Sequence, residues 1–158
     1  MNFLTEHGIS SYGELESKLT AVSARRDTAH AEIKRIESRS AELALVMKHA
    51  GTYRQLKPLY DRYRKSNDKE KFLRGHESEI ILFEAAAREL KRLGAVPLPT
   101  TESMKTELAN LNAEKERLLA EYKAARTEAQ EYETVKQNVD ALLTVPKEQE
   151  QQRRHELE

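Results

Sequence analysis

The sequence contains no cysteine and no tryptophan, and only five glycines and four prolines interrupt its 158 residues. Without cysteine the chain has neither a disulfide framework nor a thiolate metal site, which is compatible with a reducing, cytoplasmic setting. Few glycines and prolines mean few breaks, so we expect few, long elements. The longest apolar run, around residues 80–83, is far shorter than the roughly 20 residues of a membrane helix. We therefore expect a cytoplasmic protein without membrane association.

Charged residues make up 34% of the chain and hydrophobic residues 38%. Alanine, leucine, glutamate, lysine and arginine, all good helix formers, dominate the composition. A compact core needs a larger apolar share, so the composition predicts an elongated, all-α protein.

A regular heptad pattern occupies residues 10–50, the predicted first arm. Ser11 and Glu14 have the spacing of a capping box, which predicts a helix start. Apolar residues then recur in steps of three and four, as in the seam of a coiled coil. This first ladder consists of Tyr12, Leu15, Leu19, Val22, Arg26, Ala29, Ile33, Ile36, Ser40, Leu43, Met47 and Ala50.

A second ladder of the same kind occupies residues 100–145, the predicted returning arm. Thr100 or Thr101 is the expected cap, and the ladder consists of Met104, Leu108, Leu111, Lys115, Leu118, Tyr122, Ala125, Ala129, Tyr132, Lys136, Val139 and Leu143. Two ladders of equal length on one chain are expected to pair. The predicted fold is an elongated antiparallel helical bundle, or coiled coil, with two long arms and a helical hairpin, forming one domain over residues 1–145.

Residues 51–93 connect the arms and form the predicted elbow and helical hairpin. Gly51 and Pro58 predict a kink or a short break, because an internal proline costs on the order of 3 kcal/mol in a helix. A capping box at Thr52 would then start a new helix, and Asn67 would cap the next one. A shorter helix over 77–93 is expected to stop at Gly94, which is well placed as the C′ residue.

Residues 146–158 are polar without periodicity, which predicts a disordered tail. Its last two residues, Leu-Glu, are typical of the remnant of a cloning site before an affinity tag. On this interpretation the chain is a fragment of a longer protein.

Positive charge is concentrated in the elbow, which we define as residues 52–75. The whole chain has 27 basic and 27 acidic residues, but residues 53–74 hold eight basic and three acidic ones. A basic strip interleaved with aromatic rings is typical of nucleic-acid binding. The candidate nucleic-acid-binding residues are Arg54, Lys57, Arg62, Arg64, Lys65, Lys69, Lys71 and Arg74.

The elbow aromatics Tyr53, Tyr60, Tyr63 and Phe72 have two interpretations. Exposed rings would stack on unpaired bases. Alternatively, the rings form the core of the hairpin and the basic side chains its solvated exterior, as their helical spacing favours.

The sequence offers no catalytic residue, no cofactor-binding motif and no metal site. The five histidines, at positions 7, 30, 49, 76 and 155, show no metal-ligand spacing. We find no Gly-rich phosphate loop and no nucleophile motif. We therefore expect a chain that is not an enzyme and takes no small-molecule substrate or cofactor.

Five segments follow one another in a fixed order: LTEHGISSYGELESKL, GTYRQLKPLYDRYRK, EIILFEAAARELKRLG, LPTTESMKTELANLNAEKERLLAEYKAARTE and VKQNVDALL. In this order, over residues 3–145, they resemble the helical C-terminal region of relaxase/mobilisation proteins of conjugative and mobilisable elements. In that family a nuclease domain lies upstream and nicks DNA at the transfer origin, using a tyrosine and a histidine-bound metal. This chain has neither motif, so no catalytic residue is carried over.

The resemblance implies a non-catalytic accessory domain that supports contacts with DNA of the transfer-origin region, or with relaxosome or transfer-machinery proteins, during plasmid transfer. The alternative is an autonomous coiled-coil scaffold that forms a homodimer through its heptad faces and binds no nucleic acid.

Overall fold

The computed structural model describes the backbone of residues 11–157 and the side chains of residues 11–143. The described residues form three helices and no strand: α2 (Tyr12–Lys65), α3 (Lys69–Arg92) and α4 (Thr101–Leu157). The fold is therefore all-α, as the composition predicted. The chain divides into two compact units, one made of Met1–Ile33 with Glu116–Glu158 and the other of Lys34–Lys115.

The first unit pairs the beginning of α2 with the later part of α4. Its core consists of Leu15, Val22, Ala129 and Tyr132, and partly buried apolar side chains surround these four. Because low numbers on α2 meet high numbers on α4, the two helices are antiparallel here, as predicted. Two polar contacts fix the register: Tyr12 donates to Asp140 Oδ1 at 2.7 Å, and Arg25 lies 3.7 Å from Glu128.

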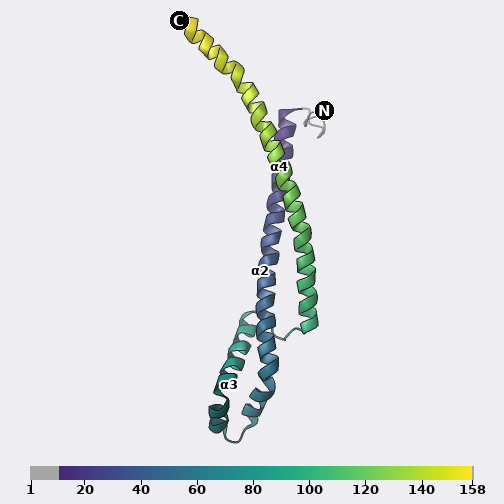
Figure 1. Cartoon of the computed structure of the whole chain (residues 1–158), viewed down its shortest axis with the longest axis vertical. Coiled ribbons are helices and arrows are strands. Elements are labelled where there is room, and N and C mark those ends of the chain that lie inside the picture. Colours follow the sequence, from purple (N-terminus) through teal and green to yellow (C-terminus); the bar gives the residue numbers. More distant parts are fainter. Residues whose placement is uncertain (1–10, 158) are drawn as a thin grey trace. The chain divides into compact units, whose positions relative to one another are not determined.

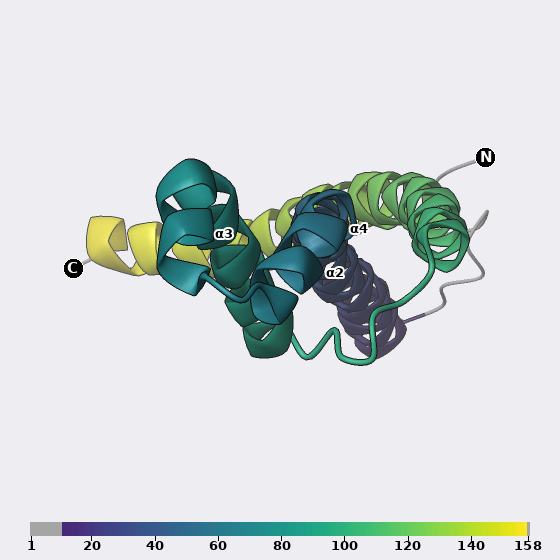
Figure 2. The ribbon, with the colours of Figure 1, turned by 90° about the horizontal axis from the view of Figure 1, so that it is seen from below.

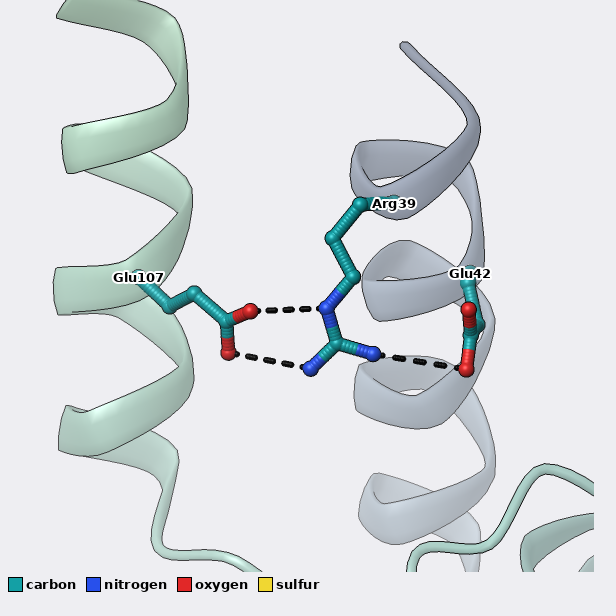
Figure 3. A network of polar contacts seen from close by, with 3 residues as sticks. All are labelled: Arg39, Glu42 and Glu107. Carbon is teal, nitrogen blue, oxygen red and sulfur yellow. Dashed lines mark hydrogen bonds and ion pairs between the residues drawn. The ribbon is translucent and has the colours of Figure 1, made fainter. Parts of the chain in front are cut away.

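The second unit contains three helical segments. In both ribbon views α2 lies between α3 and the first turns of α4 (Figure 1 and Figure 2). Arg39 on α2 donates to both carboxylate oxygens of Glu107 on α4, at 2.7 and 3.1 Å, and also contacts Glu42 at 3.3 Å (Figure 3). Lys115 lies 3.5 Å from Glu37. These contacts make α2 and α4 antiparallel in this unit also.

The heptad ladders identify the packed faces of α2 and α4. All positions of the first ladder are buried or half-buried, and so are those of the second, except Leu143 at 61% exposure. Val46 is also buried although it belongs to neither ladder. Its burial beside the ladder residue Met47 means that α2 is covered over more than one seam, which fits its place between two helices in the second unit.

The sequence predicted a kink or a short break between Gly51 and Pro58. The short break is absent, because α2 runs through both residues to Lys65. Thr52 is therefore not a helix cap, and its hydroxyl donates to the Lys48 carbonyl within the helix. Proline removes one backbone hydrogen bond, but packing against neighbouring helices supplies most of a helix's stability in a protein and outweighs that loss.

Most helix ends follow the predicted chemistry. The hydroxyl of Ser11 accepts the amide of Glu14, and that of Thr100 accepts the amide of Ser103. At the start of α3, however, Asp68 is the cap and accepts the amide of Lys71. The sequence predicted Asn67 as this cap, which is one residue too early. Asparagine and aspartate both cap helices well, because each carries a hydrogen-bond acceptor on a short side chain.

Two glycines accompany changes of backbone conformation in α3, one after its C-terminal end and one within it. Gly94 has φ of 70° and follows Leu93, the C-cap of α3, as predicted. The amide of Ala95 donates to the carbonyl of Leu90, which completes a Schellman motif. Next to Gly75, the helix has a kink at His76, whose φ and ψ of −136° and 27° are not helical.

The backbone of α4 is helical through Pro146 to Leu157, whereas the sequence predicted a disordered tail over 146–158. The segment is rich in glutamate, glutamine, lysine and arginine, which favour helix whenever a preceding helix supplies the nucleus. The sequence also predicts a single turn over residues 3–7, which lies outside the described residues. No helix in the described part of the chain is long and apolar enough to cross a membrane.

Candidate functional site

A row of six rings fills the space between the end of α2 and α3. Phe83 stacks against Tyr53 and Tyr60, with ring centroids 4.8 and 4.3 Å apart and interplanar angles of 25° and 24°. The row continues through Tyr63 to Phe72, at 5.8 and 6.0 Å, and from Phe72 to His76 at 4.6 Å. Offset ring pairs of this kind stabilise helix packing beyond the area that they bury. The elbow aromatics therefore join α2 to α3.

The rings are only partly covered. Phe83 is 5% exposed, whereas the three tyrosines, Phe72 and His76 are half-buried. Tyr53 and Tyr60 each give one face to Phe83 and also line a surface groove. The rings pack as the second interpretation predicted, as a core between the two helices of the hairpin. Part of the surface of Tyr53 and Tyr60 nevertheless remains open to the groove.

This α2–α3 groove has a volume of about 650 Å³. We call its buried and half-buried apolar residues the floor, and the charged side chains that α2 and α3 contribute its two walls. The lining residues are Tyr53, Lys57, Tyr60, Asp61, Arg64, Lys65, Phe83, Glu84, Ala87, Arg88 and Lys91.

The groove carries an excess of positive charge. Lys57 pairs with Asp61, one helical turn further on, at 3.2 Å, so these two charges largely compensate each other. Arg64, Lys65, Arg88 and Lys91 are all exposed. Within the described residues none of these four makes an ion pair within 4 Å. Four cations therefore face the single remaining carboxylate, Glu84.

The eight predicted elbow cations separate into three groups. Three of them, Lys57, Arg64 and Lys65, line the groove. Arg54 has a structural role, because it donates to Thr101 Oγ1 at 2.8 Å and to the Pro99 carbonyl and so ties α2 to the start of α4. The remaining four are exposed but do not line the groove, and we call them the outer cations: Arg62, Lys69, Lys71 and Arg74.

Sequence reasoning missed Arg88 and Lys91, because the candidate residues all came from the elbow, where the charge excess is sharpest, and these two residues lie beyond it. They are three positions apart on α3 and line the groove together with Ala87. The signal was present, since positions 84, 87, 88 and 91 share one face of a helix. Arg92 is not part of this group: it lies 2.7 Å from Glu89, and that hydrogen bond lowers the pKa of the Glu89 carboxyl.

The described residues offer no group of three metal-ligating side chains. Of the three histidines within them, His30 lies against the Tyr122 ring at 5.7 Å, His49 is half-buried and His76 contacts Glu79 at 3.4 Å. His7 and His155 lie outside the residues whose side chains are described.

The fold and the groove together define an all-helical protein with a cationic, aromatic-floored surface groove. Comparison with protein-family models, with curated proteins and with solved structures finds no match.

Proposed function

We propose that this chain is a non-catalytic helical accessory domain of a DNA relaxase/mobilisation protein, and that it contacts the phosphate backbone of DNA through the cations of the α2–α3 hairpin. The sequence resemblance supplies the DNA-processing context. The lack of cysteine fits a cytoplasmic setting for this role. Relaxosome or transfer-machinery proteins are further candidate partners of the same domain.

The observation that carries the proposal is the excess of cations on one hairpin that make no ion pair with any residue whose side chain is described. The four outer cations and the four groove cations project from the end of α2 and from α3. Exposed, unpaired lysines and arginines release counterions from nucleic acid on binding, which gives sequence-independent affinity. Elsewhere many surface cations are paired, as Arg39 is with Glu107 and Arg117 with Glu121.

The alternative, a homodimeric scaffold, depends on heptad faces. In each unit these faces are already covered by the pairing of α2 with α4 within one chain, and only Leu143 of the two ladders is exposed. A dimer seam would have to replace this packing. We therefore expect the isolated chain to sediment as a monomer, and a stable dimer would favour the scaffold instead.

Oligonucleotide binding tests the DNA proposal directly. We expect the chain to bind single- or double-stranded oligonucleotides in low salt, with affinity that falls linearly on a log–log plot as salt rises. A variant with Arg62, Arg64 and Lys65 changed to Gln should bind about 10-fold or more weakly and show a smaller salt slope, by about 0.7 to 0.9 per lost phosphate contact. Glutamine keeps the helical propensity at the end of α2.

The matched control changes three exposed lysines outside the hairpin, Lys18, Lys105 and Lys123, to Gln. Net charge falls equally in both variants, so only a local contact separates them. No detectable binding in low salt, or equal losses in the two variants, would refute the proposed role of the hairpin.

A further inference from the structure

We infer that the α2–α3 groove holds unpaired nucleotides of a single DNA strand, so that the hairpin prefers single-stranded to double-stranded DNA. This inference rests on the proposed function and adds the class of DNA and the residues that select it. Arg88 and Lys91, which the sequence-based candidate set did not include, supply one wall, and Arg64 and Lys65 supply the other.

The dimensions of the groove favour a single strand. It lies between two packed helices, whose axes are typically 8–10 Å apart, and its volume of about 650 Å³ is within the range of sites for small molecules. A duplex keeps its bases paired inside a much wider cylinder and can only rest on the rim. A nucleotide of a flexible strand is small enough to enter.

The arrangement of charge suits a phosphodiester backbone that follows the groove. Arg64 and Lys65 come from the last turn of α2, and Arg88 and Lys91 from the second half of α3. The phosphates of a strand that lies between these two pairs would have cations on both sides. Cations on one wall would be enough to bind an isolated phosphate. The single uncompensated carboxylate, Glu84, lies on the same helix face as Arg88 and is one turn away from it.

The floor of the groove suits a base. Tyr53, Tyr60, Phe83 and Ala87 line it, and the two tyrosines are half-buried with one face already against Phe83. Their remaining surface is apolar and aromatic, and such surfaces bind bases without sequence preference. In a duplex the base faces are stacked on each other and cannot make this contact. The floor therefore discriminates between the two forms of DNA. The groove cations contact the strand that enters, whereas the outer cations attract both forms.

The test compares three probes on the full chain: a fluorescent thymidine decanucleotide, an abasic decamer with the same phosphates, and a 10-base-pair duplex. We expect the wild type to bind the thymidine decamer about 10-fold more tightly than the abasic decamer, since each base contact on an aromatic ring contributes severalfold or more. The variant with Arg88→Gln and Lys91→Gln should lose most of its affinity for the single strand and little for the duplex. Its control is the pair Lys105→Gln and Lys123→Gln.

Both substituted residues are exposed, so the variant should keep the fold, and its far-UV circular dichroism and urea midpoint verify this. Equal affinity for the thymidine and abasic decamers would overturn the inference. So would equal losses for single strand and duplex, or a loss no larger than that of the control. Each of these results leaves the phosphate contact of the proposed function intact, whereas a wild type that binds none of the probes in low salt overturns both proposals.

Discussion

The ion pair between Arg39 and Glu107 (Figure 3) allows a quantitative test of the pairing of α2 with α4 in the second unit. Two hydrogen bonds, of 2.7 and 3.1 Å, join the guanidinium to both carboxylate oxygens, and Glu42 contacts the same guanidinium at 3.3 Å. The side chains of Arg39 and Glu107 are 40% and 41% exposed. Water therefore screens the pair strongly, and most such pairs contribute about 0.2–1 kcal/mol. The bidentate geometry places this one near the upper limit, at about 1 kcal/mol.

A double-mutant cycle with Arg39→Gln and Glu107→Gln measures this coupling, with urea unfolding followed by far-UV circular dichroism. We expect about 0.5–1 kcal/mol at neutral pH and low salt, falling towards zero in about 1 M salt, where the Debye length is roughly 3 Å. The control cycle uses Arg117 and Glu121, which lie 3.5 Å apart within one helix, and should give about 0.3–0.5 kcal/mol.

The coupling between Arg39 and Glu107 should weaken as pH falls, because it depends on the charged form of Glu107. The hydrogen bond from Arg39 holds the pKa of the Glu107 carboxyl below its ordinary value. A carboxyl whose pKa is lower in the folded state contributes stability above its unfolded pKa, and this contribution is lost as pH falls through the folded pKa. The coupling should therefore shrink steadily from about pH 5 towards pH 2. A coupling near zero at neutral pH, or one that does not change with pH, would refute the register of α2 and α4 at this point.

Three further predictions concern single positions. Leu43→Ala should destabilise the protein by about 2–5 kcal/mol, because Leu43 is 2% exposed, whereas Leu45→Ala, at 43% exposure, should cost far less in the same urea assay. Gly94→Ala should cost about 1–2 kcal/mol because the φ of Gly94 is +70°. Gly51→Ala should instead stabilise by about 0.5–1 kcal/mol, because Gly51 lies inside α2 and an added Cβ meets nothing within 4 Å. Thermal unfolding distinguishes the two. Tyr12 donates a hydrogen bond to the carboxylate of Asp140 on α4, and this bond raises the pKa of the Tyr12 hydroxyl to about 12. The bond should therefore stabilise the fold below about pH 10, and this stabilisation should disappear as pH rises through 12. In a spectrophotometric titration, Tyr12→Phe should remove the ionisation of Tyr12 near pH 12.

The paired faces of the bundle were predictable from sequence because the heptad pattern is a local code. Steps of three and four along α2 and α4 define one stripe on each helix, and a stripe of that length has few ways to be buried. Polar members of the ladders did not disturb the pattern. Arg26 and Ser40 are half-buried within the seam, since a long or small side chain can cover apolar neighbours while its polar atoms stay near water.

The helix breaks were less predictable, because local propensity competes with tertiary packing. Between Gly51 and Pro58 the sequence predicted a kink or a short break, and α2 continues without a break, because its flanks pack against neighbouring helices. At His76 the helix is kinked, directly before the segment 77–93 that the sequence predicted as a helix of its own. Here glycine lowers the helical propensity, and the following segment starts again with its own first turn. Helix propensity alone does not tell which of the two sites, Pro58 or Gly75 with His76, interrupts the helix.

The groove itself required the structure, since its two walls are brought together only by the α2–α3 hairpin. The elbow count captured Arg64 and Lys65 but not Arg88 and Lys91, because a charge window along the chain does not follow a helix that returns antiparallel. The aromatic residues show the same limit: their spacing on α2 predicts one apolar face, but only the stack on Phe83 reveals which ring surface remains open. The four cations Arg64, Lys65, Arg88 and Lys91 come from two distant parts of the sequence, but the hairpin brings them to one groove. This clustering separates the proposed binding groove from an ordinary solvated helix face. Substitution of Arg88 and Lys91 tests this distinction most directly.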